Sequence, residues 1–190
     1  MKGNKTLFIK VLVAVLILAV IGGMWFVKNQ PNISEKTESE QLSQEKTELP
    51  EKLQSADFSL NITEIVDFEA LAEYEIPVIV DYGADSCIPC KQMAPLLEKL
   101  NEEMYGKAFI KFADVWKYPE AASNVPVQVI PTQVFFNADG TPFEPSDKLL
   151  EQVVFDYYSH VDTGEHIFTV HQGGLTEEQM RLILAEMGVE

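Results

Sequence analysis

The only two cysteines of this chain flank two residues in Cys87-Ile88-Pro89-Cys90, where the apolar run 77–82 gives way to a helical pattern. A bridge across so short a loop removes little entropy from the unfolded chain, so a structural disulfide here would add little stability. At the start of a helix, by contrast, free N–H groups and the helix dipole stabilise a thiolate. The pair therefore predicts redox chemistry, with an inert bridge as the alternative.

The order of strand and helix patterns predicts an α/β domain. The run 77–82 is almost entirely apolar and predicts a central strand buried on both faces. Apolar residues then recur at three- and four-residue spacing from Cys90 to about Tyr105, which predicts a helix ended by Gly106. Further strands are predicted at 58–62, 108–113, 132–136 and 165–170, with helices at 66–74, 118–123 and 176–187.

Three separated motifs resemble the thioredoxin family. Residues 80–97 resemble its active-site segment, including an aspartate on the preceding strand, a proline between the cysteines and a second proline five residues after them. Residues 129–132, Val-Ile-Pro-Thr, look like its cis-proline loop, and Gly173 before 175–180 resembles the opening of its last helix. The resemblance extends from about residue 58 to 188.

The resemblance implies a thioredoxin fold, a central mixed sheet flanked by helices, for a domain at 57–190. One segment departs from the family, because a longer insert at 141–164 stands in place of a short hairpin before the last strand. The apolar and aromatic residues of the insert are expected to pack on the flank of the domain. A surface for a partner is the alternative.

By resemblance, Cys87 is the nucleophile that forms a mixed disulfide, and Cys90 is the thiol that resolves it. Asp81 is the buried acid that accepts the proton of Cys90. Lys111 resembles the strand lysine that pairs with this acid, with a solvated lysine at a strand edge as the alternative.

The substrate-binding residues implied are Ile88, Pro89, Ile130 and Pro131. Pro131 is expected to be cis, and the backbone of Ile130 to pair with an extended client segment; an ordinary trans proline in a turn is the alternative. Ile88 and Pro89 supply no imidazole or cation to stabilise a thiolate, which favours a reductant over a strong oxidant. Aromatic residues usually flank the family's motif, but Gly83 and Ser86 stand there, which affects the breadth of substrate binding.

The expected redox group is the Cys87–Cys90 pair, with no bound cofactor or metal. His160, His166 and His171 fit no zinc spacing, and the last two would point to opposite faces of one strand. A module that binds copper or haem-related cargo through the cysteines and a histidine is the rival from another class.

Residues 1–28 are predicted to be a membrane anchor. Three lysines precede residues 11–27, which contain no charge or proline and would span about 25 Å as a helix. A cleaved signal sequence is the alternative, but the apolar stretch is long and no Ala-x-Ala site follows it. The excess of lysine before the segment places the N-terminus in the cytoplasm and the domain outside.

Residues 29–56 are rich in Glu, Ser, Gln, Lys and Thr and are predicted to be a disordered linker. The net charge of −16 argues against nucleic acid as a partner. We therefore expect an extracytoplasmic thiol–disulfide oxidoreductase that reduces exported proteins, with an exported oxidase or isomerase as the rival. An exported reductant needs electrons, and the resemblance implies a transmembrane thiol donor of the cytochrome-c-biogenesis type.

Overall fold

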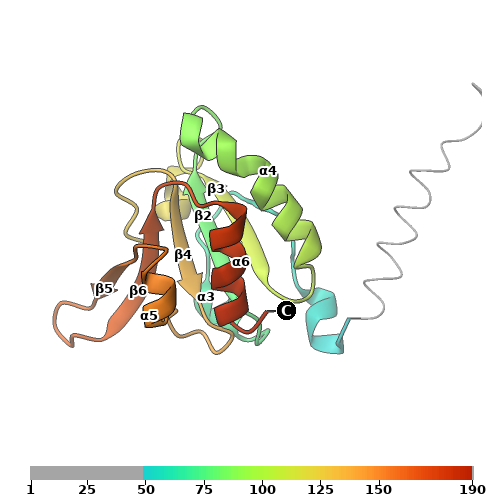
Figure 1. The fold of residues 1–190 in the computed structure, drawn as a ribbon. Coiled ribbons are helices and arrows are strands. Elements are labelled where there is room, and N and C mark those ends of the chain that lie inside the picture. Colours follow the sequence, from blue (N-terminus) through green and yellow to red (C-terminus); the bar gives the residue numbers. More distant parts are fainter. Residues whose placement is uncertain (1–48, 190) are drawn as a thin grey trace, which may run out of the picture. The chain divides into compact units, whose positions relative to one another are not determined.

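A computed structural model describes residues 49–189, which form a six-stranded mixed sheet with the order β1-β3-β2-β4-β6-β5 (Figure 1). β1 and β2 each pair in parallel with β3, whereas the pairs β2–β4, β4–β6 and β6–β5 are antiparallel. Every residue of β2 is buried, as expected for the central strand. The strands are β1 (Asn61–Ile62), β2 (Val78–Gly83), β3 (Phe109–Asp114), β4 (Thr132–Phe136), β5 (Asp156–Ser159) and β6 (His166–Gln172).

Helices cover both faces of this sheet. On one face, α4 and α6 pack against apolar side chains of β2, β3 and β4, and Figure 1 shows the two helices on the same side. On the other face, α3 and the short 3-10 helices pack against the alternate side chains of the same strands. The helices are η1 (Glu51–Ser55), α3 (Phe68–Ala72), α4 (Ile88–Glu103), η2 (Pro119–Ala122), α5 (Asp147–Leu150) and α6 (Glu177–Glu186).

The folded domain begins before the predicted boundary at residue 57. Residues 1–48, which contain the expected anchor and most of the expected linker, lie outside the described residues. The polar composition of residues 49–56 predicts linker, but Glu51–Ser55 form η1, and Leu53 is buried at 6% exposure. One apolar side chain placed against the core thus outweighs the polar composition of this stretch. Within residues 49–189, no helix combines the length and apolar character needed to cross a bilayer.

The insert at 141–164 becomes part of the core and of the sheet. It contains α5 and β5, and β5 adds a sixth strand at the edge, beside β6. The prediction that its apolar side chains pack on the domain is confirmed for a buried group beneath α5, whereas Tyr157 is 50% exposed on the edge strand. The buried group is Phe143, Leu149, Val153 and Phe155.

Candidate active site

The two cysteines form a disulfide at the start of α4. Cys87 is the N-cap of the helix, and the backbone N–H of Cys90 donates to its Sγ at 3.3 Å. Pro89 lies in the first turn, where a missing N–H costs nothing. Both cysteines are buried, and Cys87, at 8% exposure, is the slightly more exposed residue, with Cys90 at 4%. When the bridge opens, the N-terminus of the helix stabilises a thiolate on Cys87.

The loop before β4 faces this disulfide. The Ile130–Pro131 peptide bond is cis, as predicted. The carbonyl oxygen of Ile130 lies 3.9 Å from Sγ of Cys87, and Gly173 donates its N–H to the carbonyl of Pro131 at 2.8 Å. The three motifs recognised in the sequence therefore meet at one end of the sheet. The backbone of Ile130 is within reach of a client segment bonded to Cys87.

Exposed apolar side chains surround the cysteines. Ile88 is 72% exposed and Val129 50% exposed, so both residues beside the disulfide present apolar surface to solvent. Trp116, which follows β3, is 63% exposed and was not singled out from the sequence. The sequence signal for this role is that Trp116, like Tyr118, is an aromatic residue in the short segment after the predicted strand 108–113. These side chains provide an apolar contact surface that Gly83 and Ser86 do not.

Asp114, at the end of β3, joins the loop before Cys87 to the loop that carries Trp116. Its carboxylate accepts the backbone N–H groups of Asp85, Trp116 and Lys117, each at 3.0 Å. Desolvation acts to raise the pKa of Asp114, but these hydrogen bonds and the charge of Lys117 lower it overall. Lys117 also pairs with Asp85. The ionised carboxylate therefore holds together the backbone just before Cys87 and the backbone just after β3.

Asp81 is fully buried on β2, beneath Cys90. Gly83 is two residues further along the same face of the strand, and a Cβ there would lie 3.2 Å from Sγ of Cys90. Burial raises the pKa of Asp81 from 3.8 to about 7, while a hydrogen bond from Gln133 acts in the opposite direction. A carboxyl group that titrates near neutral pH is suited to accept a proton from a thiol. The role of Asp81 as the proton acceptor for Cys90 stays a prediction, and its burial and its raised pKa are compatible with that role.

The predicted pairing of Lys111 with Asp81 is wrong. Lys111 is opposite Val80 in the register of β2 and β3, so it lies on the other face of the sheet. It is not a solvated lysine either, because it is only 4% exposed and its Nζ donates to the carbonyls of Asp57 and Ser59 at 2.5 and 2.8 Å. Desolvation lowers its pKa, and Asp57 partly offsets that effect. Through these two hydrogen bonds, Lys111 links the segment before β1 to the sheet.

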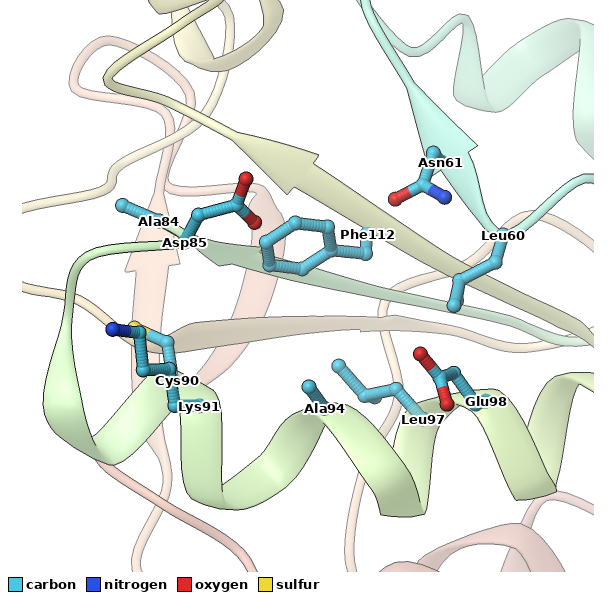
Figure 2. A pocket seen from close by; sticks show the side chains of 10 residues that line it. All are labelled: Leu60, Asn61, Ala84, Asp85, Cys90, Lys91, Ala94, Leu97, Glu98 and Phe112. Carbon is cyan, nitrogen blue, oxygen red and sulfur yellow. The ribbon is translucent and has the colours of Figure 1, made fainter.

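Phe112, not a lysine, is opposite Asp81 on β3. Its ring packs on Gly83, since a Cβ there would lie 2.9 Å from ring atom Cε2. Phe112 also lines a cavity of about 210 Å³ beside Cys90. Figure 2 shows the ring directed from β3 into the space above α4, with Ala94 and Leu97 rising from the helix below it. The aromatic group missing from position 83 is therefore supplied by the neighbouring strand.

Gln133 on β4 is a functional candidate that the sequence reasoning missed. It is fully buried, and its Nε2 donates to Oδ1 of Asp81 at 2.5 Å. The available signal was one amide in the otherwise apolar run 133–136, directly after the cis-proline loop.

The hydrogen-bond partners of His166 and His171 do not include the cysteines. His171 contacts the carbonyl of Val154, and His166 contacts Phe168 and Thr169. Within residues 49–189, no group of three or more His, Cys, Asp or Glu side chains is arranged to hold a metal ion.

Comparisons of sequence and of structure show which known proteins this chain is similar to. The family profile described as Thioredoxin matches residues 60–155. Thioredoxins of Staphylococcus aureus strains Mu50 and MW2 are each 38% identical over 91 residues, which is 45% of this chain and 86% of theirs. The solved structure of Fasciola hepatica thioredoxin is 23% identical with a TM-score of 0.46, covering 68% of this chain and 99% of that one.

A cysteine pair at a helix N-terminus, facing a cis-proline loop and backed by a buried acid, defines a site for thiol–disulfide exchange. On this site and these matches, the chain belongs to the thioredoxin family and is a thiol–disulfide oxidoreductase.

Asp81→Asn is expected to stabilise the protein at alkaline pH and to slow exchange. Because the folded pKa is raised, ionisation of Asp81 opposes folding: its contribution to stability is complete below about pH 4 and is lost as the pH rises to about 7. The difference corresponds to on the order of 4 kcal/mol. Chemical denaturation at pH 4 and pH 8 should show the variant equal to wild type at the first pH and more stable at the second. A variant less stable at both pH values and fully active would show that Asp81 is only structural.

Gly83→Ala is expected to destabilise the domain by about 1 to 3 kcal/mol, because the added methyl group meets both the Phe112 ring and Sγ of Cys90. Thermal unfolding of the oxidised protein measures this effect. Phe112→Leu combined with Gly83→Ala should recover part of the loss, since the smaller side chain vacates the space. Gly174→Ala is a matched control, because its Cβ would have ordinary contacts with Met93. Equal losses from the two single alanine variants would contradict the packing argument.

Proposed function

We propose that this protein is a membrane-tethered, extracytoplasmic reductant of disulfides in exported proteins. The observation that carries the direction of electron flow is the N-terminus of α4. In the oxidised pair, Sγ of Cys87 has the backbone N–H of Cys90 as a hydrogen-bond donor at 3.3 Å, while exposed Ile88 and Pro89 contribute no charge between the cysteines. Strong oxidants owe their potential to extra stabilisation of the reduced thiolate. Such stabilisation is modest here, which favours a reductant.

The reaction begins when the Cys87 thiolate attacks a client disulfide. The client's disulfide breaks, a mixed disulfide forms on Cys87, and one client sulfur leaves as thiolate. Cys90 then transfers its proton to Asp81 as its sulfur attacks Sγ of Cys87. The second client sulfur leaves, and the Cys87–Cys90 bridge takes its place. Two electrons pass from the protein to the client, and the two thiols are the only redox groups that this exchange requires.

Location and electron supply rest on the sequence. The apolar stretch 11–27 after three lysines supports an anchor with its N-terminus in the cytoplasm. Outside the cytoplasm the oxidised pair has no soluble thiol pool to reduce it. A transmembrane thiol protein, of the kind that serves cytochrome c biogenesis, is the proposed donor.

Cys90→Ser in the full-length chain is expected to accumulate disulfide-linked adducts with exported proteins in the membrane fraction. The mixed disulfide on Cys87 then has no intramolecular thiol to resolve it. Non-reducing gels and mass spectrometry of affinity-purified protein measure the adducts, and Cys87→Ser is the matched control that should form none. Adducts with cytoplasmic proteins alone would contradict the proposed location, and the absence of any reducible adduct would contradict exchange with protein clients.

The reduction potential of the Cys87–Cys90 pair decides the direction. We expect a value near −270 mV, as in thioredoxin, from equilibration with glutathione or dithiothreitol and quantification of the thiols. A value less negative than about −180 mV would assign the protein to the oxidases or isomerases instead.

A further inference from the structure

The side chain that faces Asp81 most closely is neutral. β4 places Gln133 directly opposite Asp81, and the hydrogen bond from Nε2 to Oδ1 measures 2.5 Å. Both side chains are fully buried. The Asp81 carboxyl group therefore receives this hydrogen bond from a buried side chain on the neighbouring strand β4.

The other groups around Asp81 cannot replace this donor. β3 presents the Phe112 ring opposite Asp81, and α4 contributes Cys90 and Met93 to this face, with Met93 Sδ lying 3.5 Å from Nε2 of Gln133. Among these groups only Cys90 titrates, once the bridge is reduced. The nearest cation on β3, Lys111, is on the opposite face.

Charged side chains near the disulfide line a cavity to which Asp81 does not contribute. Asp85, Lys91 and Glu98 line the cavity beside Cys90, whose lining does not include Asp81. Gln133 is thus the one hydrogen-bond donor to the Asp81 carboxyl among the described residues.

We propose that Gln133 is a positioning residue for thiol–disulfide exchange, which stabilises the ionised Asp81 carboxylate and orients it to take the proton of Cys90. Gln133 occupies Oδ1, whereas Oδ2 has no partner among the described residues and is the oxygen left to accept the proton. The proton passes from the Cys90 thiol to Oδ2 as the new sulfur–sulfur bond forms and the client thiolate leaves. This proposal depends on the exchange reaction of the family, not on the direction or location proposed above.

The Gln133 amide affects the pH range in which Asp81 is ionised and can accept a proton. Burial alone favours protonated Asp81, and the Gln133 hydrogen bond opposes burial by favouring the carboxylate. Without the amide, Asp81 keeps its proton at neutral pH and cannot accept another. The loss should therefore appear at neutral pH and disappear at alkaline pH, where the acid is ionised in either protein.

Gln133→Met, which keeps the length of the side chain and removes the amide, tests the proposal. In single-turnover reduction of a client disulfide by the full chain, the rate at pH 7 should fall about fivefold, because a rise of about one unit from a pKa of about 7 lowers the ionised fraction of Asp81 from about one half to about one eleventh. The rate at pH 9 should stay within about twofold of wild type, and the acid limb of the pH profile should move upward by about one unit. An unchanged profile, or a loss equal at every pH, would overturn the proposal.

Thr169→Val is the matched control. Thr169 is also fully buried on a central strand, and its Oγ1 donates to the carbonyl of Phe143 at 2.5 Å, within the insert's packing region. This variant loses a buried hydrogen bond and some stability, but its pH profile should match wild type. In the Asp81→Asn background, Gln133→Met should cause no further change at pH 7, since the group it positions is gone.

Wild-type protein supplies a second measurement that does not depend on the variant folding. The side-chain NH₂ resonances of Gln133 should titrate with the same midpoint as the Asp81 carboxyl carbon in NMR spectra. They should not titrate in Asp81→Asn. Resonances of Gln133 that are independent of pH in wild type would refute the assigned contact.

Discussion

The burial of a carboxyl group in the middle of β2 is the constraint on which the site depends. Asp81 has a strand on either side and lies beneath the first turn of α4, so its ionised form loses hydration that one amide only partly replaces. The same burial brings its pKa to about 7, close to the range in which thiols exchange protons. The ionised form of Asp81, which is the form that can accept a proton during disulfide exchange, therefore lowers the stability of the fold.

The chain brings the sulfur atoms to this acid through the connection between β2 and α4. A parallel neighbour, β3, ends at the same edge of the sheet, and its last residue, Asp114, holds the backbone N–H of Asp85 just before the cysteines. The cis-proline loop approaches from β4, which is antiparallel and therefore starts at this edge. Two parallel strand ends and one antiparallel strand start thus converge on Cys87. This convergence explains why motifs more than 40 residues apart form one site.

Features with a local signal were predictable from the sequence. The cysteines and Pro131 each stand next to a strand or helix boundary that hydrophobic patterning reveals, and Asp81 is the single acid in an otherwise apolar run. Lys111 was not predictable in this way, because its face depends on the register of β3, and a shift of one residue moves a side chain to the other side of the sheet. Gln133 was not predictable as a functional residue for a related reason. An amide in a strand has no evident function until the register places it opposite a buried acid.

The chain departs from the family pattern in having no aromatic residue at position 83 and no lysine paired with Asp81. The position of the Phe112 ring is the physical cause that these two departures share. Gly83 leaves a space beside Cys90, and Phe112 fills that space from β3. Phe112 also occupies the position opposite Asp81, on the face where a lysine would have to lie to pair with the acid. One ring therefore both replaces the missing aromatic group and excludes a cation. A carboxylate without a cation needs a neutral donor, and β4, the other neighbour of β2, is where the register allows one. The glycine at 83, the phenylalanine at 112 and the glutamine at 133 are thus consistent with a single solution to packing and charge around the resolving cysteine.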